Sequence, residues 1–204
     1  MKNISPLVDG LIESFQCLPG VGPKSARRMV MHLLEKDRDA GKLLSRSLLQ
    51  TLETVGHCAQ CRIFSEKEIC NICSSSKRDS STICLVETVS DVFAIEESNQ
   101  YHGKYFILHG HLSPIDNVGP DELGLRQLFE LIKVNEINEI ILATNSTLEG
   151  EATAHFIYDN LKEVVSLNIT RLARGVPLGG ELEYVDEGTI RHAFSGRISL
   201  KDNE

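Results

Sequence analysis

The chain has 204 residues, of which 41% are hydrophobic and 25% charged, an ordinary composition for a globular protein. No run approaches the roughly 20 apolar residues of a transmembrane helix, and the first residues lack the apolar core of a secretory signal, so we expect a cytoplasmic protein with no membrane partner. The net charge of −8 argues against nucleic acid as a partner, but it is unevenly distributed: residues 1–84 carry +3 and residues 85–204 carry −11. The basic part is therefore the candidate for binding phosphate.

Three helices are predicted in the first part of the chain. Residues 5–16 have apolar side chains at helical spacing, with Ser5 as a cap and Pro6 at the first helical position, where no N–H is needed. Further helices are expected over residues 24–36 and 45–55, with a polar turn over 37–42 between them. The side chains expected to face inward are Ala26, Met29, Val30 and Leu33 in the second helix, and Leu48, Leu49, Leu52 and Val55 in the third.

A glycine turn, Gly20-Val21-Gly22, joins the first two helices. Glycine permits the positive φ of a tight turn and lets a phosphate approach the backbone, and the amides that follow stand at a helix N-terminus, which attracts anions. Lys24, Arg27 and Arg28 add positive charge in the first turns of the second helix. The segment has the helix-hairpin-helix form, so we predict that Gly20, Gly22 and the three basic residues bind the DNA backbone without reading bases.

Two other interpretations of this turn compete with DNA binding. A nucleotide-binding P-loop needs a glycine directly followed by Lys-Ser or Lys-Thr, but Pro23, which has no N–H, separates Gly22 from Lys24, so the P-loop is rejected. A plain pair of antiparallel helices with solvated arginines stays open from the hairpin alone, because such turns are common in helical proteins.

Four of the six cysteines form two C-x₂-C pairs eight residues apart: Cys58, Cys61, Cys70 and Cys73. Each pair brings two thiolates to one metal ion from a tight turn, and two pairs complete the tetrahedral sulfur site that Zn²⁺ favours. Protein ligands fill all four positions, so we predict one structural zinc ion per chain and not a catalytic one.

The neighbouring histidine and the remaining cysteines have simpler interpretations. His57, beside Cys58, could replace one cysteine as a ligand of the metal ion, but the four cysteines already suffice. Disulfides are not expected in a cytoplasmic protein. Cys17 and Cys84 lie in apolar runs and are expected to be buried.

From residue 82 the pattern changes to strands alternating with helices, which indicates a parallel sheet with helices on both faces. The expected strands are 83–86, 105–109, 140–144 and 167–172, and the expected helices are 91–97, 121–134 and 151–163. A polar stretch over 74–81 is expected to be a hinge before this domain. The tail from residue 175 is either a swapped or partner-binding arm or a mobile end.

Two acidic loops follow strands of the predicted sheet, at the edge where α/β folds place their sites. The first loop holds Glu87, and the second holds Glu149 and Glu151. Gathered carboxylates could hold Mg²⁺ through oxygen ligands. The alternative interpretation is an acidic patch that caps helix N-termini, for which Asp91 and Glu151 are well placed.

The strand-end Val-Glu, followed later by Ala-Thr-Asn and Glu-Gly-Glu, resembles the Toprim domain of topoisomerases, primases and related nucleases. Catalytic members carry an Asp-x-Asp pair in the second loop, and the resemblance places Asn145 and Thr147 at those positions. Neutral groups thus replace two anionic ligands, which leaves Glu87, Glu149 and Glu151 as a weak Mg²⁺ site or a partner-binding surface.

The order of the parts is more specific than any one of them. A Leu-Pro-Gly-Val-Gly-Pro-Lys-Ser-Ala turn comes first, the cysteine pairs second, the Toprim-like region third, and a tail beginning Gly-Val-Pro-Leu-Gly-Gly-Glu-Leu-Glu-Tyr last. This order resembles the RecR family of bacterial recombination mediators over essentially the whole chain. The implied fold is α+β in several parts: a helix-hairpin-helix region over 1–56, a four-cysteine zinc finger over 57–73, an α/β Toprim domain with a mostly parallel sheet over 81–176, and a C-terminal arm over 177–204.

The resemblance implies a protein of recombinational DNA repair that has no catalysis of its own. Family members act with RecO and RecF, independently of RecBC, and help RecA to load at gaps. They bind gapped, double-stranded and single-stranded DNA, and they form homo-oligomers, often ring tetramers, through the N-terminal helices and the C-terminal arm. Lys24 and Arg28 match the DNA-contacting residues of the family, with Arg27 as an addition. The alternative function is that of a Mg²⁺-dependent nuclease, topoisomerase or primase.

Overall fold

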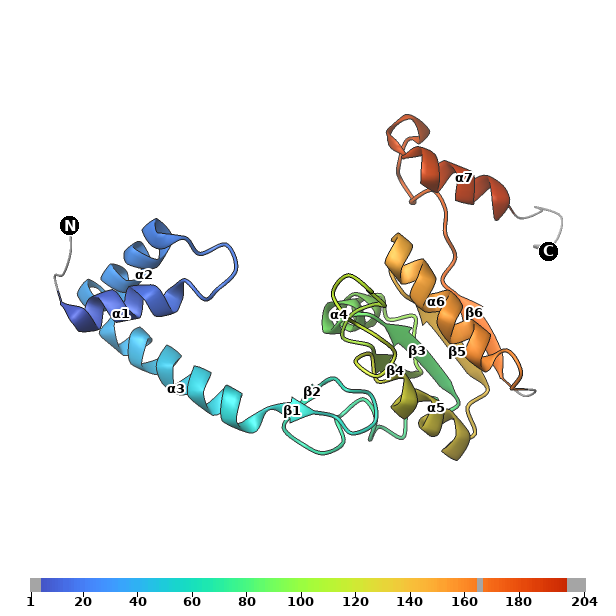
Figure 1. Cartoon of the computed structure of the whole chain (residues 1–204), viewed down its shortest axis with the longest axis horizontal. Coiled ribbons are helices and arrows are strands. Elements are labelled where there is room, and N and C mark those ends of the chain that lie inside the picture. The colour runs from blue at the N-terminus through green and yellow to red at the C-terminus, as the bar shows by residue number, and fades with distance from the viewer. Residues whose placement is uncertain (1–4, 165–166, 198–204) are drawn as a thin grey trace. The chain divides into compact units, whose positions relative to one another are not determined.

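The structure, a computed structural model, describes residues 5–164 and 167–197 as two compact units that divide between residues 55 and 56 (Figure 1). The start of the predicted helical region (1–4), two residues of the predicted Toprim domain (165–166) and the end of the predicted arm (198–204) lie outside the described residues. The first unit contains α1 (Pro6–Phe15), α2 (Pro23–Glu35) and α3 (Arg38–Thr54). The second contains β1 (Gly56–His57), β2 (Phe64–Ser65), β3 (Thr82–Val86), α4 (Val89–Glu97), β4 (Lys104–Ile107), α5 (Leu125–Val134), β5 (Glu139–Ala143), α6 (Leu148–Leu161), β6 (Asn168–Arg171), a 3-10 turn (Leu182–Tyr184) and α7 (Glu187–Ser195).

Helices α1 and α2 lie where the sequence predicts them, whereas α3 is longer than predicted. It begins at Arg38 because Asp37 caps it: the Asp37 carboxylate accepts a hydrogen bond from the backbone N–H of Ala40 at 2.8 Å. The segment 37–42 is therefore the start of a helix, and the prediction of a turn there is wrong. Acidic residues favour both turns and helix N-termini, and only the cap geometry distinguishes the two. Ser5 occupies the N-cap position of α1, but its side chain makes no capping bond.

The first unit buries few of its apolar side chains. Ala26 and Val30 of α2 are fully buried as predicted, whereas Met29 is exposed. Cys17, which was expected to be buried, is also exposed. The leucines of α3 are exposed as well, contrary to the predicted inward stripe: Leu43, Leu44, Leu48, Leu49 and Leu52. Helical periodicity identifies the face that avoids water, but the described residues of the first unit leave that face of α3 uncovered.

The second unit is built on four parallel strands in the order β4-β3-β5-β6, which confirms the predicted parallel sheet. Alternate residues of β3 face opposite sides: Ile83 and Leu85 join an apolar cluster with α5 and α6. Cys84, buried as predicted, and Val86 join a second cluster, which contains α4 side chains and the four paired cysteines. One face of the sheet is therefore covered by α5 and α6, and the other by α4 together with residues 56–75, which we call the cysteine module.

Arg62 fastens the cysteine module to the sheet. Its guanidinium donates to the backbone carbonyls of Ile107 at 3.1 Å and of Leu123, and it stands over the Phe106 ring at 5.7 Å from the centroid. Burial lowers the pKa of Arg62. Gly124, in the left-handed region at φ +71°, leaves room for this guanidinium where a Cβ would collide with it. Helix α5 begins only after this turn, and not at residue 121 as predicted.

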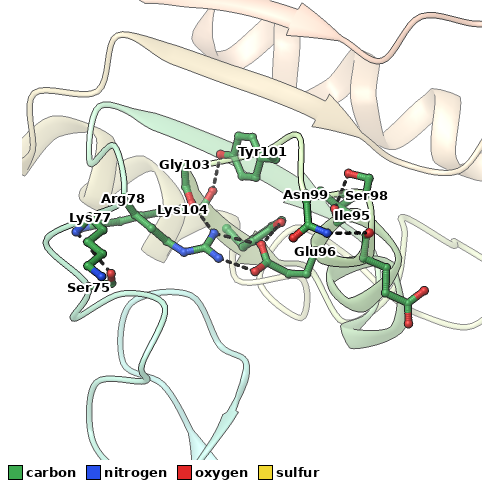
Figure 2. A network of polar contacts seen from close by, with 12 residues as sticks. Ser75, Lys77, Arg78, Ile95, Glu96, Ser98, Asn99, Tyr101, Gly103 and Lys104 are labelled. Atoms are coloured by element: carbon green, nitrogen blue, oxygen red, sulfur yellow. Dashed lines mark hydrogen bonds and ion pairs between the residues drawn. The ribbon is translucent and has the colours of Figure 1, made fainter.

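The polar stretch 74–81 is fixed to the sheet instead of forming the expected hinge. Arg78 donates to the Glu96 carboxylate at 3.0 Å and to the carbonyl of Gly103 at 3.0 Å (Figure 2). The Tyr105 hydroxyl donates to the same carboxylate at 2.6 Å. These contacts join the chain that leaves the cysteine module to the end of α4 and the start of β4, so the two parts form one unit.

The C-terminal tail carries a short helix. Asp186 caps α7 by accepting a hydrogen bond from the backbone N–H of Thr189 at 3.0 Å. Helix α7 buries none of its residues. Apolar side chains of the tail are exposed: Leu178, Leu182, Tyr184 and Phe194. None of the helices in the described ranges is both long and apolar enough to span a bilayer.

Candidate nucleic-acid interface and metal centre

The turn between α1 and α2 has the backbone geometry that the sequence predicts. Gly20 has φ +78°, a left-handed conformation that strains any residue with a side chain. Gly22 has extended backbone and stands at the N-cap of α2. No heavy atom lies within 4 Å of the position that a Cβ on Gly22 would occupy. Packing within the chain therefore does not require glycine at position 22. Because glycine has no side chain, however, the N-terminus of α2 stays open to an approaching anion.

Three basic side chains surround this helix N-terminus. Lys24, Arg27 and Arg28 are all exposed, and their spacing of three and four residues places Lys24 beside the two arginines on α2. The first turn of α2 contains no acidic residue. Across the described ranges, none of the three forms an ion pair. Their charges and the helix N–H groups can therefore meet the same phosphate chain.

The four paired cysteines converge on one point in the second unit. The Sγ atoms of Cys58, Cys61, Cys70 and Cys73 all lie within 4.8 Å of one another, and all four residues are buried. None of the four is in a disulfide. Backbone N–H groups donate to sulfur: that of Cys70 to Cys58 at 3.3 Å, and that of Cys73 to Cys70 at 3.4 Å. Such bonds hold the sulfur atoms in position and favour their thiolate form.

The protonation behaviour of these thiols fits a bound cation. Burial opposes ionisation of Cys58, but backbone N–H groups outweigh it and lower the pKa to about 7. The Cys73 side chain raises the pKa of Cys61, and burial raises that of Cys70 to about 11. Four thiols this close do not all ionise without a cation between them, and Zn²⁺ accepts four such ligands. The donor set thus fits a structural zinc ion, as predicted.

The substitute ligand His57 does not belong to this site. Its ring stands against the ring of Phe64, with 5.1 Å between the centroids, and at the same distance from the ring of His109. Among the residues that the structure describes, the four cysteines are the one group of His, Cys, Asp or Glu side chains close enough to hold a metal ion.

Glu87, the first of the predicted carboxylates, is already hydrogen-bonded within the protein. It lies at the end of β3 and is 3% exposed. Its two oxygens accept hydrogen bonds from the backbone N–H and the side-chain amide of Asn145, both at 2.8 Å. His111 Nδ1 lies 3.3 Å from one of these oxygens. The amide of Asn145 therefore occupies one side of the carboxylate on which a metal ion would bind.

The structure does not gather the other two carboxylates around Glu87. Glu151 pairs with two guanidinium groups, those of Arg171 at the end of β6 and Arg174 just beyond it. Glu149 is exposed in the first turn of α6. The cap interpretation holds for Asp91, whose carboxylate accepts from the backbone N–H of Thr88 at 2.8 Å within a capping box.

Two residues of the second loop have local roles that sequence reasoning missed. Thr147 caps α6, because its hydroxyl accepts a hydrogen bond from the backbone N–H of Gly150 at 3.1 Å. A Cβ on Gly150 would collide with the carbonyl of Asn145 and approach Glu87 at 2.8 Å, so the loop needs glycine between its two glutamates. The Glu-Gly-Glu motif carries that signal, whereas nothing in the sequence marks Arg171 and Arg174 as partners of Glu151.

Four protein-family models match successive segments of the chain. The RecR helix-hairpin-helix model matches residues 8–52, and the RecR model of a zinc finger domain with four cysteine ligands matches residues 55–75. The Toprim domain model matches residues 81–173, and the RecR C-terminal model matches residues 175–198. Together these matches leave only the ends and short connections of the chain uncovered.

Proposed function

Because this chain belongs to the RecR family, whose domains imply the role of a recombination mediator, we propose that it clamps DNA in the RecF/RecO pathway and helps RecA to load at gaps. The observation that carries this proposal is the α2 N-terminus, where Gly22 leaves the amides open and Lys24, Arg27 and Arg28 are exposed together. Backbone amides and flexible cations hold phosphates but read no bases. Binding of this kind suits a mediator that acts at gaps of any sequence.

The experiment is a salt titration of DNA binding by the purified protein. Wild type is expected to lose affinity steeply as salt rises, because each phosphate contact releases counterions. The double variant Lys24→Ala/Arg28→Ala is expected to bind at least about tenfold more weakly at moderate salt and to show a shallower salt dependence, since phosphate contacts are removed. Fluorescence anisotropy with labelled duplex and single-stranded oligonucleotides measures both quantities.

A matched control removes the same charge elsewhere. Arg126 and Lys133 are exposed basic residues on α5 of the second unit, so Arg126→Ala/Lys133→Ala should leave the affinity and its salt dependence close to those of wild type. If the hairpin variant bound DNA as tightly as this control, the hairpin would not be the DNA site.

We further propose that the chain cuts no DNA, in keeping with the generally non-catalytic character of its family. Glu87 is the strand-end carboxylate that a metal-dependent Toprim centre would use, and Asn145 donates one hydrogen bond to each of its oxygens. Cleavage, relaxation or primer synthesis that required Mg²⁺ and was lost in Glu87→Gln would establish the alternative enzyme instead.

The proposed assembly is a homo-oligomer, a ring tetramer, that meets RecO and RecF. Exposed leucines along α3 and exposed apolar groups of the tail support self-association, because such surfaces are covered in stable proteins. Within the described ranges, Glu149 alone of the three loop carboxylates is neither hydrogen-bonded nor paired with an arginine, which suits it to a basic partner such as RecO. Sedimentation velocity tests the stoichiometry. From the proposed role on chromosomal DNA we also infer that the protein is cytoplasmic.

A further inference from the structure

Three aromatic rings form an exposed cluster on the cysteine module, and the proposed function does not use them. His57 and Phe64 are directly paired across the β1–β2 ladder, so their side chains lie on the same face. His109, which follows β4, completes the group, with its ring centroid 5.1 Å from that of His57 and 6.3 Å from that of Phe64. We call these three residues the aromatic platform.

The platform is held rigidly by the fold. His109 has φ +59°, an uncommon conformation for a residue with a side chain, and its Nε2 lies 2.8 Å from the carbonyl oxygen of Arg62. Arg62 also has positive φ, and its guanidinium is bound to carbonyls of the sheet unit. Strained backbone of this kind persists only where the surrounding structure enforces it. The rings are thus in place before any ligand arrives, which reduces the entropy lost on binding.

The rings are nevertheless open to solvent. Phe64 is 59% exposed, and both histidines are exposed as well. The Phe64 ring is therefore accessible to a ligand, unlike the fully buried ring of Phe106. Two of the three rings are imidazoles, whose nitrogens need hydrogen-bond partners when they are covered. An occupant must therefore offer a flat apolar face together with polar edge groups.

We propose that the Phe64 ring of the aromatic platform stacks an unpaired nucleobase of single-stranded DNA, with the planes of His57 and His109 inclined to that ring by 37° and 51°. Every base has a flat π-face and polar edges, whereas an aliphatic side chain of a protein partner would offer no hydrogen bond to the imidazole of His57. Bases inside a duplex are already stacked and paired, so the platform engages single-stranded DNA selectively. The proposal rests on the proposed function, since it assumes that the chain binds DNA, and it adds recognition of the single-stranded part of a gap.

Phe64→Ala tests the platform with two ligands, a single-stranded oligothymidine and a blunt duplex of equal length. Loss of one stacking contact should weaken single-strand binding about tenfold and leave duplex binding unchanged. The salt dependence should stay that of wild type, because no phosphate contact is removed. Phe64→Trp should restore or strengthen single-strand binding.

The chain offers a matched control in Phe93, an α4 phenylalanine with 60% exposure that is not part of the platform. Phe93→Ala should change neither affinity. Zinc content equal to that of wild type verifies that the cysteine module is intact in each variant. His57→Leu, which removes one imidazole while keeping a bulky side chain, serves as a second variant and should show the same preferential loss on single strands.

Two results would overturn the platform. One is single-strand binding by Phe64→Ala and His57→Leu as tight as that of wild type, and the other is an equal loss on single-stranded and duplex DNA. Failure of the hairpin proposal looks different, because it requires that Lys24→Ala/Arg28→Ala keep both the affinity and the salt dependence of wild type. The two proposals can thus fail separately.

Discussion

The four cysteines and the three loop glutamates of the second unit are both sets of candidate metal ligands, yet the groups that surround them in the fold differ. The sulfur atoms of the cysteines lie within 4.8 Å of one another. The carboxylate of Glu87 is instead bound by Asn145, and that of Glu151 by Arg171 and Arg174. The cysteines therefore depend on an external cation, whereas these two glutamates are satisfied within the chain.

This difference shows that the residue type of a ligand does not decide whether a metal binds. A buried anion must be stabilised by some positive or hydrogen-bond-donating group. Where the protein provides that group, as Asn145 does for Glu87, a metal ion has to displace it and loses affinity. At the cysteine cluster, backbone N–H groups donate to two of the sulfur atoms, but four adjacent thiolates still need a cation between them, so metal binding contributes directly to folding.

The largest expected effect tests the dependence on zinc. Cys58→Ser, or removal of the metal by a chelator, should unfold the cysteine module, because structural zinc contributes roughly 10 kcal/mol or more in small zinc domains. The sheet should also be destabilised, since the cysteines share an apolar cluster with Val86 and Ile107. Calorimetry and zinc analysis of the same sample measure the effect.

Cys17→Ser is the matched control for this experiment, because Cys17 is exposed and lies outside the cluster. It should leave the zinc content and the unfolding temperature unchanged. An unaltered unfolding transition after complete loss of zinc would contradict a structural role of the metal.

The next effect in size tests whether Asn145 serves as the internal partner of Glu87. Asn145→Ala removes the side-chain donor and leaves a nearly buried carboxylate with fewer hydrogen bonds, which should cost about 2 kcal/mol of unfolding free energy. Urea denaturation measures this cost. Asn160→Ala is the control, since Asn160 donates to a backbone carbonyl on the exposed surface of α6 and should cost much less. Equal losses in the two variants would show that Glu87 does not depend on the Asn145 amide.

The smallest effect concerns a third internally satisfied carboxylate, that of Glu96. Burial opposes its ionisation, but the hydrogen bonds from Arg78 and Tyr105 lower its pKa below the usual 4.5. A carboxylate with a lowered pKa stabilises the fold above its unfolded pKa, and this stabilisation is lost as the pH falls. Arg78→Ala should therefore cost about 1 kcal/mol at pH 7, and its difference from wild type should shrink below pH 4.5.

Thermal unfolding of wild type and Arg78→Ala between pH 3 and pH 7 measures this dependence, with the range chosen about the usual pKa of 4.5. Arg126→Ala is the comparison, because it breaks an ion pair with Asp121 in which both side chains are highly exposed. A constant difference between Arg78→Ala and wild type across this range would show that Glu96 does not titrate against Arg78.

Local chemistry made several features predictable from the sequence. The zinc ligands follow from C-x₂-C spacing, and the left-handed Gly20 follows from the need for a tight turn between two helices. The four strands and their parallel arrangement follow from apolar runs that alternate with helical patterns. In each case the residues that decide the feature lie close together along the chain, or their apolar side chains recur at a fixed spacing.

Contacts between distant segments could not be predicted in this way. The exposed leucines of α3 are an example. Their spacing along the sequence identifies an apolar face of the helix, but it does not identify the surface that covers that face. The sequence by itself determined the metal site, the basic hairpin and the type of sheet. Only the tertiary structure decided that Asn145 donates to Glu87, that Arg62 binds the cysteine module to the sheet, and that His109 joins His57 and Phe64. These partners meet only after the strands have been ordered in the sheet.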